Sequence, residues 1–191
     1  MSTRLKEIAR RSFAPEIALS SFESLEECLS QIGSELEQSS DDFLASLSNL
    51  LVISPPMLDS LRIHPEWFAW LRARTEKFFT QEGSVVAGHD YDVAWDEWCA
   101  QRAAPSEIME SLRAFKRREY LEIAFLDIAG LADFEQIVLR LSALASWTIV
   151  RALSHCWHSV ALEMASHFRA PAVSQGFAVV AFGKLGGQEL N

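Results

Sequence analysis

The 191-residue chain has 17 Lys and Arg against 26 Asp and Glu, a formal net charge of −9, and 49% hydrophobic residues. This composition supports a buried core and excludes disorder over the whole chain, and the deficit of cations argues against broad nucleic-acid binding. The three cysteines form no Cys-x-x-Cys pair, which argues against a zinc knuckle or a redox pair. With neither a signal-peptide pattern nor a long uninterrupted apolar run, the sequence predicts a cytoplasmic protein that does not enter a membrane.

The first half of the chain shows the boundary signals of several short helices. Ser21 is predicted to cap one helix, and Asp41-Asp42 places negative charge at the start of the next. Pro55-Pro56 is predicted to close that second helix, because proline has no amide hydrogen and restricts the residue before it. A stretch rich in glycine and polar residues, Gln81 to Asp92, predicts a loop.

Two long helices are predicted next. The first runs from Pro105-Ser106 to Gly130, where the glycine provides a left-handed stop. The second begins after Asp133, and its apolar residues keep a helical period as far as Phe168. Because amphipathic helices are stabilised by burying their apolar faces against one another, residues 1–170 are predicted to form a helical N-terminal region built as a bundle.

The composition changes after residue 170. Arg169–Gly176 predicts a linker, and Phe177–Phe182 is an apolar run of strand length with glycine on both sides. A lone strand cannot satisfy its own backbone groups, so residues 171–191 predict the first strand and glycine-rich turn of an incomplete α/β domain. The expected fold class is therefore mainly α, a helical bundle followed by the start of a truncated α/β domain.

The predicted strand leads directly into the turn Gly183-Lys184-Leu185-Gly186-Gly187. A strand that enters a glycine-rich turn is a common phosphate-binding layout, because residues without Cβ let backbone amides approach an anion. Gly183, Lys184, Gly186 and Gly187 are therefore the predicted phosphate- or nucleotide-binding residues. The alternative is a plain tight turn between two elements. The spacing excludes a Walker A loop and a Rossmann fingerprint.

The same residues carry a family resemblance. Gly183–Asn191, after an apolar strand, resembles the signature of the bifunctional glutamine synthetase adenylyltransferase/adenylyl-removing enzyme family. The His-Pro-Glu-Trp element in Ile63–Trp67 and the basic segment Leu112–Ala124 also resemble segments of that family. The three segments stand in the family's order across residues 63–191, and the first 50 or so residues contribute little.

The resemblance implies a DNA-polymerase-β-like nucleotidyltransferase domain in which a Ser-Asp-x-Asp stretch, expected after Asn191, holds Mg²⁺. It implies the N-terminal half of the family, which removes AMP from a tyrosine of glutamine synthetase with orthophosphate and releases ADP. The other half adds AMP from ATP, and a PII-type nitrogen-signalling protein and glutamine control both. Nucleotidyl transfer relies on metal ions to neutralise developing charge. The chain by itself is therefore expected to be inactive, and no catalytic residue or metal ligand is predicted within it.

Arg113, Lys116 and Arg117 lie at helical spacing and are predicted to share a face. The favoured interpretation is a solvated face paired with neighbouring glutamates, namely Glu110, Glu119 and Glu122. The alternative is contact with a phosphate-bearing partner or with the nucleotidyltransferase domain, and Arg117 is then the residue expected to make it.

His155 and His158 sit three apart on the second long helix without an evident third metal ligand, so packing or surface roles are favoured over a metal site. His64 and Trp67 are predicted to fix a helix start in the bundle.

Two other functions remain open from the sequence. One is a non-catalytic helical interaction module whose terminal strand docks on a partner. The other is a nucleotidyltransferase of the same fold that acts on another substrate, because fold does not dictate function.

Overall fold

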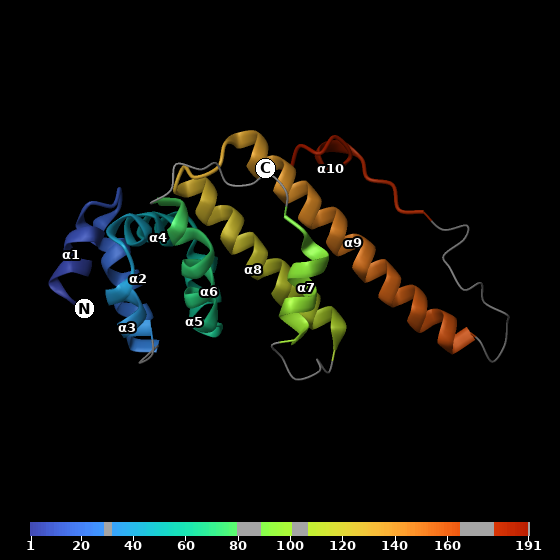
Figure 1. The fold of residues 1–191 in the computed structure, drawn as a ribbon, viewed down its shortest axis with the longest axis horizontal. Coiled ribbons are helices and arrows are strands. Elements are labelled where there is room, and N and C mark those ends of the chain that lie inside the picture. Colours follow the sequence, from blue (N-terminus) through green and yellow to red (C-terminus); the bar gives the residue numbers. More distant parts are fainter. Residues whose placement is uncertain (29–31, 80–88, 101–106, 165–177, 191) are drawn as a thin grey trace. The chain divides into compact units, whose positions relative to one another are not determined.

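The computed structural model describes residues 1–28, 32–79, 89–100, 107–164 and 178–190 (Figure 1). The chain divides into two compact units. Unit 1 consists of Met1–Val86 and Tyr120–Phe134, and unit 2 consists of Ala87–Glu119 and Glu135–Asn191. Helices dominate both units, which confirms the prediction of a mainly α fold, and no strand occurs in the described part of the chain.

The described part of the chain consists mostly of helices. In chain order they are α1 Thr3–Arg10, α2 Pro15–Cys28, α3 Ile32–Gln38, α4 Asp41–Ile53, α5 Pro55–Ile63, α6 Glu66–Thr75, the 3₁₀ helix η1 Glu76–Phe79, α7 Tyr91–Ala100, α8 Ile108–Ile128, α9 Phe134–Met164 and α10 Gly183–Gly186.

Several predicted helix boundaries are confirmed by their local chemistry. The Ser40 hydroxyl accepts a hydrogen bond from the Phe43 amide at 3.3 Å and caps α4, whose first turn holds Asp41 and Asp42. Helix α4 ends at Ile53, just before the two prolines, and α5 starts with them. Gly130 follows α8 with a φ of 63°, the left-handed stop that was predicted.

Two predictions about helix boundaries are wrong. Ser21 is not a cap, because α2 already begins at Pro15 and buries Ser21 in its interior. Proline suits a first helical position, since its missing amide hydrogen would have no intrahelical partner there. The predicted loop Gln81–Asp92 ends earlier than expected, because Tyr91 already starts α7, a helix that the sequence analysis did not predict.

The core of unit 1 is built around aromatic rings. The ring of Phe43 lies 5.7 Å from that of Phe68 in an edge-on arrangement and 5.0 Å from that of Phe125, which the second half of α8 supplies. All three side chains are fully buried. At the edge of this core, Arg74 Nε lies 2.9 Å from Glu122 Oε2, so α6 and α8 are also joined by an ion pair.

The core of unit 2 is a cluster of rings from α7, α8 and α9. Phe115 packs against Trp95 at 5.3 Å, Trp98 at 6.0 Å and Trp147 at 5.0 Å between ring centroids. Trp95 and Trp147 also touch each other at 5.6 Å. Trp95 and Trp98 are buried in this cluster, and Trp147 is partly exposed.

Helix α9 also has a stretch, Phe134–Glu163, that is long and apolar enough to cross a membrane by length and composition, and the bent pair α4 and α5 passes the same test if taken together. Core helices of soluble proteins pass this test too, so the property is weak evidence.

The last described segment consists of extended residues followed by a tight turn. Residues 178–182 are exposed and belong to no strand, and the first residue of the predicted strand, Phe177, lies outside the described residues. A strand is defined by a hydrogen-bonded neighbour, and the described residues place none beside 178–182. The predicted domain boundary at residue 170 also lies outside the described residues and stays a prediction.

Candidate functional site

The glycine-rich turn at the C-terminal end forms a single helical turn, α10, closed by backbone hydrogen bonds. The Gly187 amide donates to the Gly183 carbonyl at 2.9 Å, and the Gln188 amide donates to the Leu185 carbonyl at 3.1 Å. The Glu189 amide donates to the Lys184 carbonyl at 2.7 Å. The amides at the end of the turn are therefore engaged within it. An anion would have to meet the start of the turn, at Gly183 and Lys184.

Two of the predicted glycines are required by the backbone for different reasons. Gly183 has a φ of 63°, a conformation that side chains with Cβ rarely adopt. At Gly186 a Cβ would lie 2.5 Å from the Ala181 carbonyl oxygen, so the preceding extended residues leave no room for a side chain. At Gly187 a Cβ would meet the Glu189 side chain at 3.5 Å, an ordinary contact.

The turn is exposed and is attached to α9. Phe182, which precedes it, is 86% exposed, and Lys184 is exposed as well. The Leu190 amide donates to the hydroxyl of Ser142 on α9 at 3.2 Å, and Figure 1 shows α10 beside the N-terminal part of that helix. Chemically, the turn offers the ammonium group of Lys184 beside backbone amides, which suits a phosphate better than a cation.

A pocket of about 380 Å³ lies next to the turn. Its walls come from the start of α7, from α9 and from the turn. The lining residues are His89, Tyr91, Leu139, Arg140, Ser142, Ala143, Ser146 and Gln188. Gln188 has a φ of 57°, the one positive value among the described residues other than glycine. Strained backbone of this kind is held in place only by its surroundings.

A buried charge network lies behind the His89 wall of this pocket. Glu119, with a side chain that is 1% exposed, lies 2.9 Å from Arg118 NH2 and 3.0 Å from His89 Nε2. Burial would raise the pKa of Glu119, but the imidazole of His89 and the positive charge of Arg118 outweigh it, so the pKa of this carboxyl lies below its ordinary value. The guanidinium of Arg118 also covers the Trp98 ring at 4.5 Å.

The structure corrects the predicted pairing of the basic residues on α8. Arg113, Lys116 and Arg117 are exposed, as predicted for a solvated face. Two of their three expected partners are engaged elsewhere, because Glu119 contacts Arg118 and His89 while Glu122 contacts Arg74. The reason is helical geometry, since positions 119 and 122 continue the buried stripe and not the basic face. Whether Arg117 contacts phosphate or another domain stays a prediction.

Sequence reasoning missed the network of His89, Arg118 and Glu119, although one signal was available. Leu112, Phe115 and Glu119 stand at spacings of three and four on α8, so the glutamate occupies a core position of an apolar stripe. A carboxylate at such a position needs charged or hydrogen-bonding partners.

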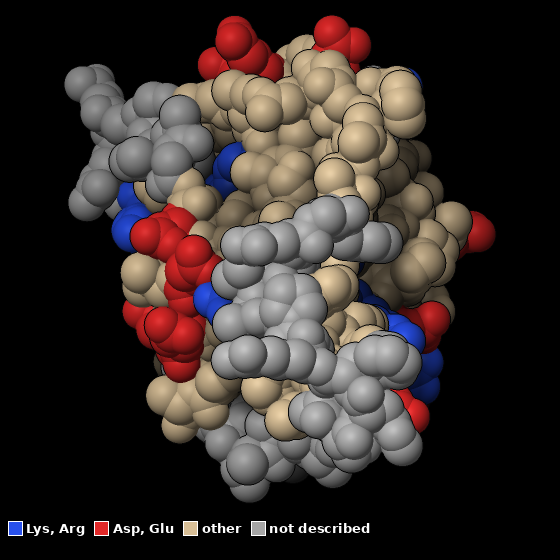
Figure 2. Space-filling view, turned by 90° about the vertical axis from the view of Figure 1, so that its right-hand side faces the viewer, with Lys and Arg blue, Asp and Glu red and all other residues tan. Residues whose placement is uncertain are grey.

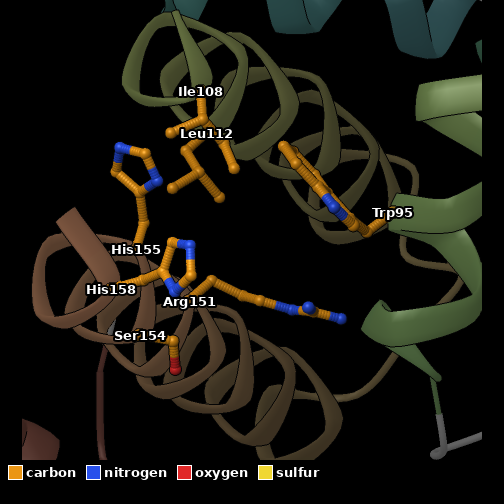
Figure 3. A pocket seen from close by; sticks show the side chains of 7 residues that line it. All are labelled: Trp95, Ile108, Leu112, Arg151, Ser154, His155 and His158. Carbon is orange, nitrogen blue, oxygen red and sulfur yellow. The ribbon is translucent and has the colours of Figure 1, made fainter. Parts of the chain in front are cut away.

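The two histidines of α9 line a second pocket, of about 270 Å³ (Figure 3). Figure 3 shows His155 and His158 on the same side of α9 as Arg151, opposite the apolar side chains of Ile108 and Leu112.

Asp92 Oδ1 accepts hydrogen bonds from Arg151 NH2 at 2.6 Å and from Trp147 Nε1 at 2.8 Å. These two hydrogen bonds hold the pKa of Asp92 below its ordinary value. No group of three or more His, Cys, Asp or Glu side chains suited to a metal occurs among the described residues.

His64 and Trp67, which were predicted to fix a helix start, pack against each other. The rings of His64 and Trp67 are stacked at 4.1 Å, and Trp67 is buried, which confirms that this pair fixes the start of α6 in its unit.

On the face drawn in Figure 2, acidic side chains gather in several groups and most of the described surface is uncharged. This distribution is consistent with the net charge of −9.

Comparison with known proteins gives a family match. Residues 44–191 match the family described as glutamate-ammonia ligase adenylyltransferase. The matched range includes the His64–Trp67 pair, the basic segment of α8 and the glycine-rich turn. No solved structure matches the chain.

Proposed function

Since this chain belongs to the glutamate-ammonia ligase adenylyltransferase family, we propose that it serves in the transfer of AMP to or from glutamine synthetase. The observation that carries the proposal is the match over residues 44–191, because it includes all three segments on which the resemblance rests. The required glycines at 183 and 186 support it, since the tight turn would be strained by a side chain at 183 and obstructed at the Ala181 carbonyl by one at 186.

Within this function we propose the N-terminal half of the family, which removes AMP from a tyrosine with orthophosphate and yields ADP. Gly183 and Lys184 would contact phosphate, Gly186 and Gly187 would shape the turn, and Arg117 would contact phosphate or the catalytic domain. ATP belongs to the opposite reaction, addition of AMP. The extended residues 178–182 would be the first strand of the DNA-polymerase-β-like domain, and residues 1–170 its helical N-terminal region.

Mg²⁺ is the cofactor that such chemistry would use, because a divalent cation stabilises the charge that develops at phosphorus. The described residues do not fit such a site, since none of them form a group of three suitable ligands. We propose that aspartates after residue 191 hold the ion and that the 191 residues alone give no turnover. The proposed partners are glutamine synthetase and a PII-type signalling protein, and the proposed location is the cytoplasm.

The experiment compares two proteins on adenylylated glutamine synthetase. One is the 191-residue chain, and the other is extended through the expected Ser-Asp-x-Asp residues. With Mg²⁺ and orthophosphate present, we expect the extended chain to release ADP and the shorter chain to release none. Absence of ADP release by a folded extended chain would refute the proposed reaction, and release by the 191 residues alone would refute the proposed position of the metal ligands.

Variants of the turn test its role in the same assay. Gly186→Val in the extended chain places a branched side chain against the Ala181 carbonyl and should abolish release. Gly187→Ala, which makes only ordinary contacts, is the matched control and should retain most of the rate. Equal rates in the two variants would count against the turn as a phosphate contact.

A non-catalytic interaction module is the second candidate. Val150, Val160 and Leu162 on α9 favour it, because their side chains are largely exposed and apolar. This alternative predicts that the extended chain binds glutamine synthetase but releases no nucleotide.

A further inference from the structure

We propose that the pocket between α8 and α9 docks an acidic segment of a partner protein, with one apolar side chain of that segment inside the pocket and its carboxylates on the cations around it. This is the pocket that His155 and His158 line, and all of its lining residues belong to unit 2. Three features of the described residues support the docking site: an apolar wall, a facing wall with nitrogen-bearing side chains, and exposed cations beside the pocket.

One wall of the pocket is apolar. Trp95 from α7 and Leu112 from α8 are buried, and Ile108 stands one turn before Leu112 on the same side of α8. The volume of about 270 Å³ lies below the range of about 300–1,000 Å³ that is usual for small-molecule sites. The pocket therefore fits a single side chain of a partner better than a whole nucleotide or cofactor.

The facing wall carries nitrogen-bearing side chains. Arg151, His155 and His158 stand at spacings of four and three on α9, and Figure 3 shows them across the pocket from Ile108 and Leu112. Arg151 is already bound to Asp92 at 2.6 Å, so the two histidines are the groups that a partner can use. Their side chains make no hydrogen bond or ion pair in the described structure, and no described Asp or Glu lines the pocket. A neutral imidazole can donate one N–H to a carboxylate, and a protonated one can donate two.

Exposed cations continue this surface along α8. Lys116 follows Leu112 by one turn on the same side of the helix, and Arg113 lies on its solvent side. Neither side chain makes a hydrogen bond or an ion pair in the described part of the chain. Glu119, three residues after Lys116, is buried and paired with Arg118. In a chain with a net charge of −9, a local group of unpaired cations favours an acidic partner at this surface over the rest of the molecule.

Together these features specify the chemistry of the partner. An apolar side chain is stabilised when it leaves water for the wall of Trp95, Ile108 and Leu112. Carboxylates on either side of it are attracted to Lys116, Arg113 and His158. A bare phosphate would leave the apolar wall in contact with water, and a nucleic acid would be repelled by the acidic remainder of the chain.

The test uses the isotope-labelled 191-residue chain and three synthetic peptides of equal length, with binding followed by NMR. The first peptide has a single phenylalanine flanked by three glutamates on each side. The second has glutamine in place of every glutamate, and the third has alanine in place of the phenylalanine. We expect the first peptide to bind saturably and to change the amide signals of Leu112, Lys116 and His158. The other two should bind about tenfold more weakly or worse, because each lacks one of the two kinds of contact.

Charge variants test the position of the site. Lys116→Glu reverses an exposed charge beside the pocket and should weaken binding of the first peptide about tenfold, as should His158→Glu, which adds a carboxylate to the pocket wall. Lys6→Glu, at an exposed position of α1 in unit 1, makes the same change in net charge as Lys116→Glu and is its matched control. It should bind normally. All three positions are exposed, so circular dichroism should show the native fold in each variant.

Each outcome either supports or overturns the docking site. Failure of the first peptide to bind, or equal binding of the glutamine peptide, overturns an acidic partner. Equal binding of the alanine peptide, or the same signal changes with sodium phosphate alone, overturns the apolar anchor and leaves a plain anion surface. Unchanged binding in Lys116→Glu, or an equal loss in Lys6→Glu, overturns the position. None of these measurements uses glutamine synthetase or ADP release, so the proposed reaction is tested separately.

Discussion

Replacement of Glu119 by glutamine is the most direct test of the buried charge network. The substitution keeps the size of the side chain and removes its charge, which leaves Arg118 buried without its carboxylate. Removing one partner of a buried ion pair costs about 3–5 kcal/mol, and glutamine retains some hydrogen bonding, so we expect a loss of about 3 kcal/mol. The Arg118 guanidinium keeps its contact with Trp98, which argues against a larger value.

The assay is urea unfolding at pH 7, followed by tryptophan fluorescence and by circular dichroism, with Asp59→Asn as the control. Asp59 lies 3.7 Å from Arg62 in an exposed pair, and its substitution should cost no more than about 0.5 kcal/mol. If Glu119→Gln loses as little stability as Asp59→Asn, the network does not stabilise unit 2 and the reasoning fails.

The pH dependence of the same variant gives an independent check. Because the pKa of Glu119 is lowered in the folded state, its contribution to stability is complete above the ordinary glutamate pKa and is lost as the pH falls through the folded-state value. The stability difference between the native chain and Glu119→Gln should therefore shrink in acid. A difference that stays constant as the pH falls to about 3 would contradict the lowered pKa.

Three further predictions concern other parts of the chain. Phe43→Ala should cost about 3–5 kcal/mol in urea unfolding, because it removes a buried ring that contacts two others, and a loss under about 1 kcal/mol would show that the unit 1 core is misassigned. Gly186→Ala should shift the amide NMR signals of the turn while Gly187→Ala leaves them nearly unchanged, and equal shifts would argue against the close contact with Ala181. Asp92→Asn should lower stability by a nearly constant amount above about pH 5 and by less and less as the pH falls toward 3, because the lowered pKa of Asp92 stabilises only the ionised form, and thermal unfolding between about pH 3 and 7 measures it.

Much of the helical architecture was predictable, because its boundaries are set by local chemistry. Asp41-Asp42, Pro55-Pro56 and Gly130 each act within a turn of the helix they start or stop, so the sequence around them is sufficient. Helix α7 also had a local signal that was missed. The Asp90 carboxylate accepts hydrogen bonds from the amides of residues 92 and 93, and it directly precedes the first buried ring, Tyr91.

The candidate site was predictable only in part. The conformational demands on Gly183 and Gly186 follow from the residues next to them, so the glycine pattern indicated a tight turn. The pocket beside the turn joins His89, Arg140 and Gln188, which are far apart in the sequence. Contacts of this kind depend on how helices pack, and neither residue spacing nor composition specifies them.

Helix α8 has a practical consequence for dissecting this protein. Residues 108–119 belong to unit 2 and residues 120–128 to unit 1, so the division between the units falls in the middle of an unbroken helix. Each unit is also made of two separate stretches of chain. No single cleavage site or expression boundary can therefore separate either unit from all of the other, and any cut between residues 119 and 120 exposes half-helix ends with unpaired amides and carbonyls. Deletions from the N-terminus should therefore damage unit 1 first, whereas deletions from the C-terminus should damage unit 2 first, because residues 1–134 still hold every segment of unit 1.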